Sequence, residues 1–243
     1  MSWIILVGAN SDMAKAAAGN FARRGYNLCL LTRNPQKLNY LTSYLSQSYK
    51  VKVIARYFEI EHFLKFKHCW DDLKPFPVGI IYFIGYLGED SLNISCSEIE
   101  KVYNLNCIYA VKMFNYFSLK FIDLNRGSLI AVSSVSGERG KSMHYLYNSA
   151  KSALSIYLQG LRLKLMDRKI KVVDIRPGFV KTKFTKFYGI KAKMAVSPEY
   201  TGEKIFQAYK SNRGIVYIPW WWRWLMLAVK LTPERLLGWI TLK

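Results

Sequence analysis

Short runs of hydrophobic residues alternate along the chain with longer stretches in which hydrophobic residues recur every three or four positions. The runs are rich in branched side chains and predict buried strands at residues 3–7, 27–32, 51–57, 78–84, 128–134, 171–176 and 215–218. The periodic stretches predict helices at residues 12–24, 36–48, 61–73, 97–122, 145–167 and 198–211. Strands and helices that alternate in this way form right-handed crossovers. The pattern therefore predicts a doubly wound parallel α/β sheet of about seven strands, flanked by helices.

The length of the chain suits one domain, because 243 residues are few for two independent cores. We expect residues 1–218 to form a single Rossmann-type domain and residues 219–243 a Trp-rich amphipathic tail. The four cysteines stand far apart and no histidines are paired at ligand spacing, which predicts neither a metal site nor disulfides. The first strand follows the amino terminus without a leader, which indicates a cytoplasmic protein.

Basic residues outnumber acidic ones by 36 to 16, for a formal net charge of +20. Such an excess favours an anionic partner, which can be nucleic acid, acidic lipid or a phosphorylated substrate. Charge alone does not distinguish the three.

The turn after the first strand is a candidate phosphate site, because ligands of such sheets bind beyond the carboxyl ends of the strands. It reads GANSDMA, and free amides at the start of the following helix can receive a phosphate. Asp12 and Ala14 stand where two further glycines are expected, so an ordinary strand-to-helix turn is the alternative. The candidate contacts are Gly8, Asn10, Ser11, Asp12 and Met13.

The ends of the second and third strands bear on the choice of nucleotide. Arg33 follows the second strand, where a basic residue suits the 2′-phosphate of NADP better than the ribose of NAD. NADP is therefore slightly favoured over NAD. Glu59, followed by Ile60, can accept a hydrogen bond from an adenine amino group, and a solvated loop carboxylate is the alternative.

A tyrosine and a lysine four residues apart share one face of a helix, where the lysine can lower the pKa of the phenol. The spacing occurs three times, at Tyr116/Lys120, Tyr147/Lys151 and Tyr200/Lys204. Only Tyr147 lies just past a central strand, with the hydroxyl of Ser134 upstream. This context indicates that Tyr147 and Lys151 are the catalytic pair.

Together these motifs resemble the short-chain dehydrogenase/reductase family over residues 1 to about 218. The matching pieces are GANSDMA, NLNCIYAV, SSVSG with YNSAK, and RPGFVKT. The resemblance implies that Tyr147 is the general acid, that Lys151 lowers the pKa of Tyr147 and holds the nicotinamide ribose, and that Ser134 hydrogen-bonds the substrate carbonyl. It also implies that Asn106 holds a water on the proton relay.

Further cofactor contacts follow from the same resemblance. Pro177 and Gly178 would close the nicotinamide pocket, and Thr182 would bind the carboxamide. After the fourth strand the family shows a longer motif, of which YFIGYLG keeps only Gly85, and the bracing of the active site by this loop is therefore open. Many members of the family are dimers or tetramers, so a homo-oligomer is expected.

The stretch GYLGED and the tail are similar to one branch of the family, the decaprenylphosphoryl-2-keto-erythro-pentose reductases. That branch reduces a lipid-linked keto sugar made by a partner flavin oxidase. A basic segment supports a phosphorylated substrate independently, since it lies where the family has a lid. Its lysines are Lys181, Lys183, Lys186, Lys191 and Lys193. A solvated basic loop without a ligand is the alternative.

The tail holds five of the seven tryptophans, at positions 220, 221, 222, 224 and 239. A helix here would place Arg223, Lys230 and Glu234 on one polar stripe, and Pro233 would break it. Because charges interrupt any apolar span of 18 residues, the tail is predicted to lie in a membrane interface rather than to cross the membrane. Packing on the domain or on a second subunit is the alternative.

These observations favour a reductase of a keto-sugar carried on polyprenyl phosphate, peripheral on the inner face of the cytoplasmic membrane. A soluble short-chain reductase of another carbonyl compound is the alternative within the enzyme class. A non-catalytic nucleic-acid-binding protein is suggested only by the charge and the aromatic residues. Such a protein would not require the intact catalytic residues, so no nucleic acid is expected.

Overall fold

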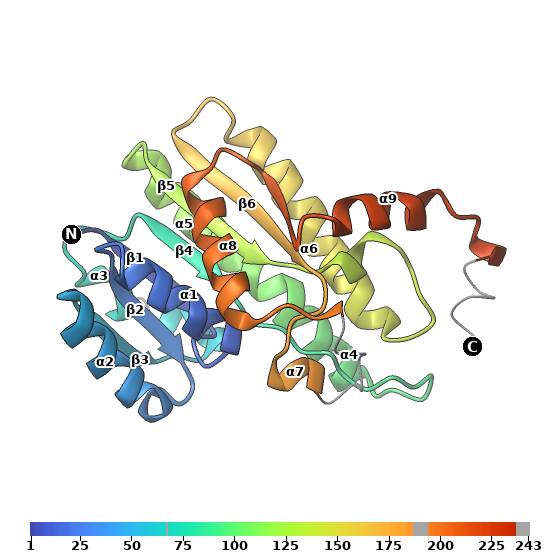
Figure 1. Cartoon of the computed structure of the whole chain (residues 1–243), viewed down its shortest axis with the longest axis horizontal. Coiled ribbons are helices and arrows are strands. Elements are labelled where there is room, and N and C mark those ends of the chain that lie inside the picture. The colour runs from blue at the N-terminus through green and yellow to red at the C-terminus, as the bar shows by residue number, and fades with distance from the viewer. Residues whose placement is uncertain (67, 187–193, 237–243) are drawn as a thin grey trace.

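A seven-stranded parallel sheet lies at the centre of the computed structural model, which describes residues 1–66, 68–186 and 194–236. In chain order the strands are β1 (Trp3–Val7), β2 (Asn27–Thr32), β3 (Val53–Tyr57), β4 (Gly79–Tyr82), β5 (Gly127–Val132), β6 (Ile170–Pro177) and β7 (Ile215–Ile218). Their order in the sheet is β3-β2-β1-β4-β5-β6-β7 (Figure 1), which confirms the predicted fold class. The order reverses between β1 and β4, and ligands of such sheets bind at this switch point.

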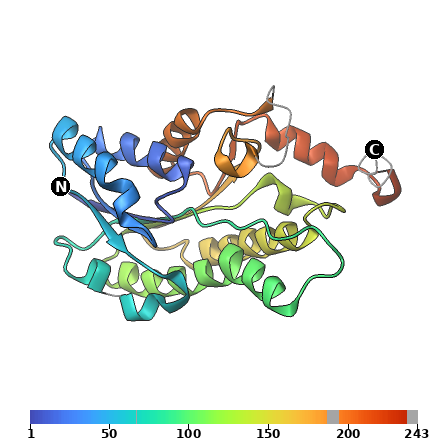
Figure 2. The same ribbon diagram turned by 90° about the horizontal axis from the view of Figure 1, so that it is seen from below.

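Two layers of helices cover the sheet (Figure 2). One layer holds α1 (Asp12–Ala22), α2 (Asn39–Tyr49) and α8 (Pro198–Lys210), and the other holds α3 (His68–Asp71), α4 (Cys96–Tyr103), α5 (Tyr109–Asp123) and α6 (Tyr145–Lys164). Each face has its own core. In β1, Ile5 and Val7 enter one core and Ile4 and Leu6 enter the other. Burial on both faces explains why this strand is a continuous apolar run rather than an alternating one.

Helices α1 and α8 touch backbone to backbone. A Cβ added at Gly202 of α8 would lie 2.7 Å from the amide nitrogen of Ala17 in α1. Small side chains on α1 complete the contact, since Ala14, Ala17 and Ala18 are all buried. The crossing holds α1 and α8 together on one face of the sheet.

The predicted helix at residues 61–73 is wrong in type. The structure has 3₁₀ turns at Ile60–Phe66, kinked at His62, followed by the short helix α3. The physical reason is the spacing of the apolar residues, which face the core at positions 60, 63, 66 and 69. A repeat of three matches the 3.0 residues per turn of a 3₁₀ helix better than the 3.6 of an α-helix.

The predicted helix at residues 97–122 is α4 and α5 joined by a π-helical turn at Asn104–Ile108. The predicted strand at 51–57 is shorter, since β3 begins at Val53. Two short elements lie outside the layers, α7 (Lys183–Lys186) and α9 (Trp222–Leu231). As predicted, the tail helix ends just before Pro233.

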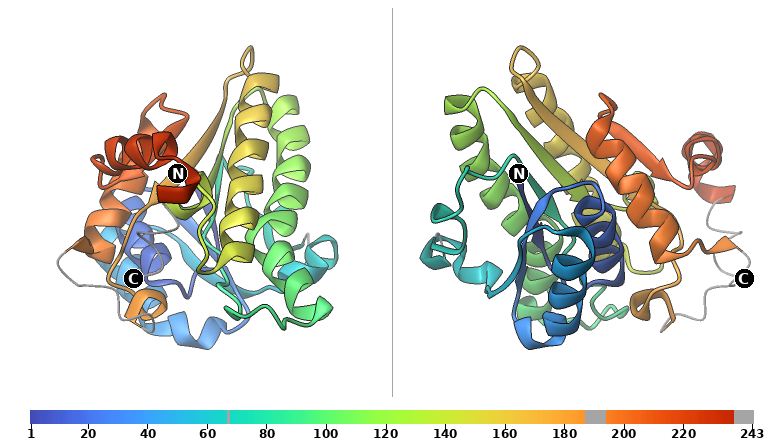
Figure 3. Two further views of the ribbon diagram at one scale, coloured as in Figure 1. Left: turned by 90° about the vertical axis from the view of Figure 1, so that its right-hand side faces the viewer. Right: turned by 60° about the vertical axis from the view of Figure 1, so that its left-hand side comes forward.

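Helix α9 lies at the margin of the molecule, beyond the end of β7 (Figures 1 and 3). Its inner face carries Trp222 and Met226, which form a third small core with Val135. Its outer face exposes Trp224, Leu227 and Leu231. Among the described residues, every helix is too short or too polar to span a bilayer.

Candidate active site

The turn after β5 presents Ser134 at the carboxyl edge of the sheet. Ser134 begins a 3₁₀ turn at Val135–Glu138, and its Oγ accepts a hydrogen bond from the amide of Ser136 at 3.0 Å. Tyr147 and Lys151 lie one helical turn apart near the start of α6, and the hydroxyl of Tyr147 interacts with that of Ser134. The structure thus brings together the three residues that the sequence placed in the catalytic centre.

Gly137 allows this turn to rest directly on α6. An added Cβ at Gly137 would lie 2.7 Å from the amide nitrogen of Ser152 and 2.8 Å from the carbonyl carbon of Lys151. Only a residue without a side chain fits in that space. The contact therefore sets the separation between the serine turn and the lysine.

Burial shifts the ionisation of both groups on α6. It raises the pKa of Tyr147 to about 12, against a lowering by the Ser134 hydroxyl. It lowers the pKa of Lys151 to about 8, with Asp174 opposing the shift. Lys151 Nζ donates to the carbonyl of Val132 at 3.0 Å and lies 5.7 Å from the centre of the Tyr147 ring. At neutral pH the phenol thus keeps its proton, and a charged ammonium lies near enough to stabilise a phenolate.

Asn106 lies fully buried in the π turn between α4 and α5. Its Oδ1 accepts from the amide of Tyr86 at 3.1 Å, and its Nδ2 donates to the carbonyls of Tyr86 and Val102. π turns often occur at functional sites, because the extra residue displaces a side chain from the helical register. An added Cβ at Gly85 would lie 3.7 Å from Asn106 Oδ1 and 3.8 Å from Lys151 Nζ. The loop after β4 is thus braced by one side-chain amide.

A cavity of about 220 Å³ opens beside the first turn, at the switch point of the sheet. Gly8 has φ +80°, and an added Cβ there would lie 2.9 Å from the Ile84 side chain. Asn10 Nδ2 donates to Thr32 Oγ1 at 2.6 Å, whereas Asn10 Oδ1 is buried without a hydrogen-bond partner. The lining residues are Gly8, Asn10, Leu31, Thr32, Arg33, Asn34, Phe58, Ile60, Glu61 and Ile84.

Glu59, the predicted adenine contact, is absent from the lining of this cavity. Its carboxylate accepts from the Tyr57 hydroxyl and lies 3.7 Å from His62 Nδ1. Ile60 and Glu61 line the cavity instead.

The next three residues of the first turn, Ser11, Asp12 and Met13, lie at the start of α1. Ser11 precedes α1 without a side-chain capping bond, and Met13 packs against the core. Asp12 Oδ2 accepts from the amide of Lys183 at 3.0 Å, which ties this turn to the start of α7.

Pro177 ends β6, and the amide of Gly178 donates to the carbonyl of Ile218 at 2.9 Å. Gly178 packs so closely on Trp222 that an added Cβ would overlap the indole. Thr182 is buried in the following loop. Of the predicted lid and tail residues, Lys191, Lys193 and Trp239 lie outside the described residues.

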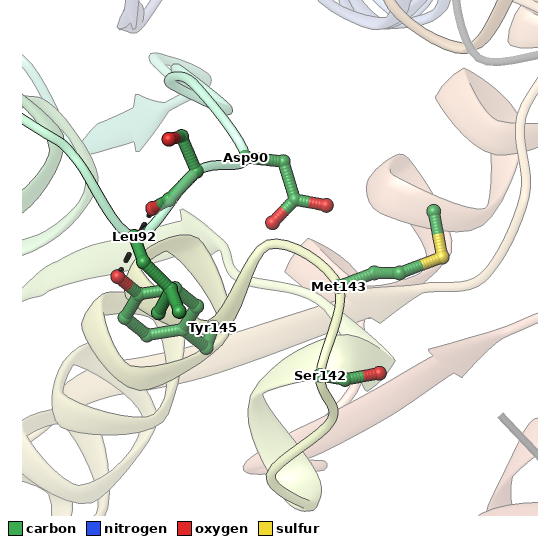
Figure 4. A pocket seen from close by; sticks show the side chains of 6 residues that line it. Asp90, Leu92, Ser142, Met143 and Tyr145 are labelled. Atoms are coloured by element: carbon green, nitrogen blue, oxygen red, sulfur yellow. Dashed lines mark hydrogen bonds between the residues drawn. The ribbon is translucent and has the colours of Figure 1, made fainter. Parts of the chain in front are cut away.

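A larger cavity of about 530 Å³ lies next to the start of α6 (Figure 4). The loop after β4 supplies one wall and the loop before α6 the other. The amide of His144 donates to Asp90 Oδ1 at 2.8 Å, and the hydroxyl of Tyr145 donates to the carbonyl of Ser91 at 3.2 Å. The lining residues are Asp90, Ser91, Leu92, Ser142, Met143 and Tyr145. Sequence reasoning missed this cavity, because loop residues carry no periodic signal.

Comparison with known proteins identifies the family through a sequence profile. A sequence profile described as short chain dehydrogenase matches residues 2–192. An uncharacterised oxidoreductase of Mycobacterium tuberculosis is 25% identical over 238 residues, which cover 95% of this chain and 94% of that protein. The very-long-chain 3-oxoacyl-CoA reductase-B of Danio rerio is 25% identical over 195 residues, which cover 76% of this chain and 61% of that protein.

The fold also matches solved structures. A short-chain dehydrogenase from Sphingobium yanoikuyae in complex with NADPH superimposes with a TM-score of 0.84 at 19% identity. The match covers 94% of this chain and 93% of that chain. At this identity the likeness shows the shared fold.

Proposed function

We propose that this chain, which belongs to the short chain dehydrogenase family, is an oxidoreductase that reduces a ketone with NADPH or NADH. The observation that carries the proposal is the assembly of Ser134, Tyr147 and Lys151 around one point at the carboxyl edge of the sheet. These groups supply a hydroxyl, a protonated phenol and an ammonium, which is the set that carbonyl reduction needs.

The lining of the cavity beside Gly8 suits the adenosine end of a dinucleotide. The left-handed φ of Gly8 leaves room for a close approach, and the unpartnered Oδ1 of Asn10 can accept from a ligand. Amides at the start of α1 would hold the diphosphate, with Ser11, Asp12 and Met13 in that turn. Arg33 would hold a 2′-phosphate, with Glu59 or Glu61 and Ile60 near the adenine. Gly85, Lys151, Pro177, Gly178 and Thr182 would surround the nicotinamide end.

The bound nicotinamide would supply a hydride to the carbonyl carbon. Tyr147 would donate its phenolic proton to the carbonyl oxygen, while the hydroxyl of Ser134 stabilises the charge that develops there. Lys151 would stabilise the resulting phenolate through its charge. Asn106 would hold a water molecule on the relay that returns a proton to Tyr147.

The test of this function is cofactor oxidation, followed at the nicotinamide absorbance with NADPH and NADH in turn. Arg33→Ala is expected to raise the KM for NADPH relative to the KM for NADH by roughly 10- to 100-fold, because a charge-assisted hydrogen bond to the 2′-phosphate is lost. Lys37→Ala, in the 3₁₀ turn Pro35–Leu38 that follows, is the control and should leave the ratio of the two KM values unchanged. An unchanged ratio of the two KM values in Arg33→Ala would mean that another group distinguishes the 2′-phosphate from the free ribose. Oxidation of neither cofactor with any ketone would refute the function.

The narrower substrate in this proposal is a keto-sugar carried on polyprenyl phosphate, with a partner oxidase supplying the ketone. The open cavity at Tyr145 supports a substrate whose bulk stays outside the protein, and Lys181 and Lys183 lie exposed on the segment after β6. Turnover of a polyprenyl-phosphoryl 2-keto-pentose should exceed that of the free keto-pentose. The alternative is another carbonyl compound, and the name of the Danio rerio relative makes a long-chain 3-oxoacyl-CoA the first one to compare.

Helix α9 supports a peripheral position on an anionic membrane surface. Trp220, Trp224, Leu227 and Leu231 recur at helical spacing and are 67%, 59%, 48% and 76% exposed. Indole rings favour the depth of lipid headgroups, and the net charge of +20 complements anionic lipid. The division into a domain at residues 1–218 and a tail at 219–243 stays part of the proposal.

Replacing Trp224 and Leu227 together by serine is expected to weaken binding to anionic vesicles by about 10-fold or more, since each buried side chain contributes about 1.5–3 kcal/mol. Co-sedimentation with phosphatidylglycerol vesicles measures the effect. The control is Leu64→Ser, which removes an exposed apolar side chain from the 3₁₀ turns between β3 and β4 and leaves α9 unchanged. Unchanged sedimentation together with loss of a dimer would mean that these exposed apolar residues contact a second copy of the chain instead.

A further inference from the structure

Four charged side chains form a connected set at the inner face of α9. Arg176 Nε lies 2.7 Å from Asp174 Oδ2, and Arg176 Nη1 lies 3.4 Å from Glu138 Oε1. Lys230 of α9 pairs with the other oxygen of Glu138. The Glu138 and Asp174 side chains are 3% and 0% exposed, so both carboxylates depend on these partners. Two acids and two bases leave the set neutral.

The set holds the turn of Ser134 at both of its ends. Before the turn, the hydroxyl of Ser133 donates to Asp174 Oδ1 and to the carbonyl of Ile175. At its other end the turn finishes with Glu138. The position of Ser134 is therefore tied to charges on β6 and α9.

Helix α9 contributes more than its lysine. Arg139 Nη2, just after the turn, donates to the carbonyl of Thr232 at 3.2 Å. Trp222 packs under Gly178 and, with Met226, against Val135 of the turn. Through these contacts α9 reaches both the catalytic turn and the loop that follows β6.

We propose that Lys230 is a positioning residue, which holds the Ser134 turn in place by neutralising Glu138. The inference deepens the proposed function and rests on it for its effect on turnover. Without the lysine, Glu138 keeps the Tyr217 hydroxyl and shares the Arg176 guanidinium with Asp174. A buried carboxylate without a full cationic partner is strongly unfavourable. The turn then shifts toward an arrangement that exposes Glu138 to water. A displacement of about 1 Å at a reacting group lowers turnover by up to about 100-fold.

The experiment compares the full chain with Lys230→Met, Lys230→Arg and Arg223→Met. Arg223 lies exposed on the same helix and serves as the control. Lys230→Met is expected to lower kcat for ketone reduction by about 10- to 100-fold while the KM for the cofactor changes by less than about 2-fold. Lys230→Arg should restore most of the activity, because it restores the charge, and Arg223→Met should behave as the unchanged chain.

Hydrogen exchange of the amides of Ser136 and Gly137 gives a second readout that needs no turnover. Both amides donate to Ser134, so their exchange should speed up in Lys230→Met by about 10-fold or more and remain slow in the other two variants. If Lys230→Met does not fold, the pair Lys230→Met with Glu138→Gln should fold, because it removes both charges together.

The outcomes separate the two proposals. If the Ser136 and Gly137 amides exchange faster in Lys230→Met but the unchanged chain reduces no ketone, the positioning role is supported and the proposed function is refuted. Unchanged exchange in Lys230→Met, or equal exchange in Lys230→Met and Arg223→Met, would overturn the positioning role whatever the activity.

Discussion

Replacing Tyr147 by phenylalanine is expected to lower kcat for ketone reduction by about 10²- to 10⁴-fold, the usual contribution of a positioned general acid. The change removes only the phenolic hydroxyl, whose proton burial retains by raising its pKa to about 12. The ring remains beside Lys151, so the dissociation constant of the cofactor should change little. Cofactor oxidation measures the first quantity, and titration of the protein fluorescence with NADPH measures the second.

The chain contains a matched control for this variant. Tyr200 and Lys204 have the same spacing and a similar geometry, with Lys204 Nζ 5.4 Å from the centre of the Tyr200 ring. They lie on α8, away from the turn of Ser134. Tyr200→Phe should leave kcat unchanged. Equal losses in the two variants, or full activity in Tyr147→Phe, would remove Tyr147 from the mechanism.

The second large effect is expected from Gly202→Ala, which should destabilise the fold by about 1–3 kcal/mol. The new methyl group would meet the backbone of α1 at Ala16 and Ala17, and a helix backbone cannot yield as a flexible side chain can. Helix α1 would have to move away from α8. Since the amides at the start of α1 are the proposed diphosphate contacts, the KM for the cofactor should rise as well.

Urea unfolding measures the change in free energy, and Gly19→Ala is the matched control. Gly19 lies in the same helix α1, and a Cβ added there meets no atom within 4 Å. That substitution should stabilise the fold by about 0.4–1 kcal/mol, because alanine restricts the unfolded chain. If both substitutions shift the stability in the same direction, the close contact between α1 and α8 is not what Gly202 provides.

Elements buried on both faces could be predicted well from the sequence. The bounds of β1 and β2 agree with their apolar runs, because a central strand that contacts two cores has few polar positions to confuse the pattern. The bounds of β7 also agree, although it is a partly exposed edge strand. The prediction for the segment after β3 was wrong, because apolar residues spaced three apart were interpreted as the 3.6-residue period of an α-helix. The π turn at Asn106 is equally invisible, since an extra residue in a helix leaves the hydrophobic pattern almost unchanged.

In the proposed active site, too, some residues could be predicted from the sequence and some contacts could not. Ser134, Tyr147 and Lys151 could be placed together because each follows a strand end or starts a helix at one edge of the sheet. The resemblance to the family is confirmed by the profile that matches residues 2–192. Glu61 lines the cavity beside Gly8, and the pairing of Glu138 with Lys230 joins segments far apart in the chain. Neither contact leaves a local pattern in the sequence.

The glycine beneath the serine turn has a consequence for how far this chain can diverge from its relatives. At Gly137 main chain meets main chain, so the spacing of the reacting groups does not depend on the shapes of the side chains in either core. Substitutions can then accumulate in both cores as long as the sheet and α6 keep their places. The 25% identity that relates this chain to an uncharacterised oxidoreductase over 238 residues leaves most side chains different, and the main-chain contact at Gly137 places no demand on their shapes.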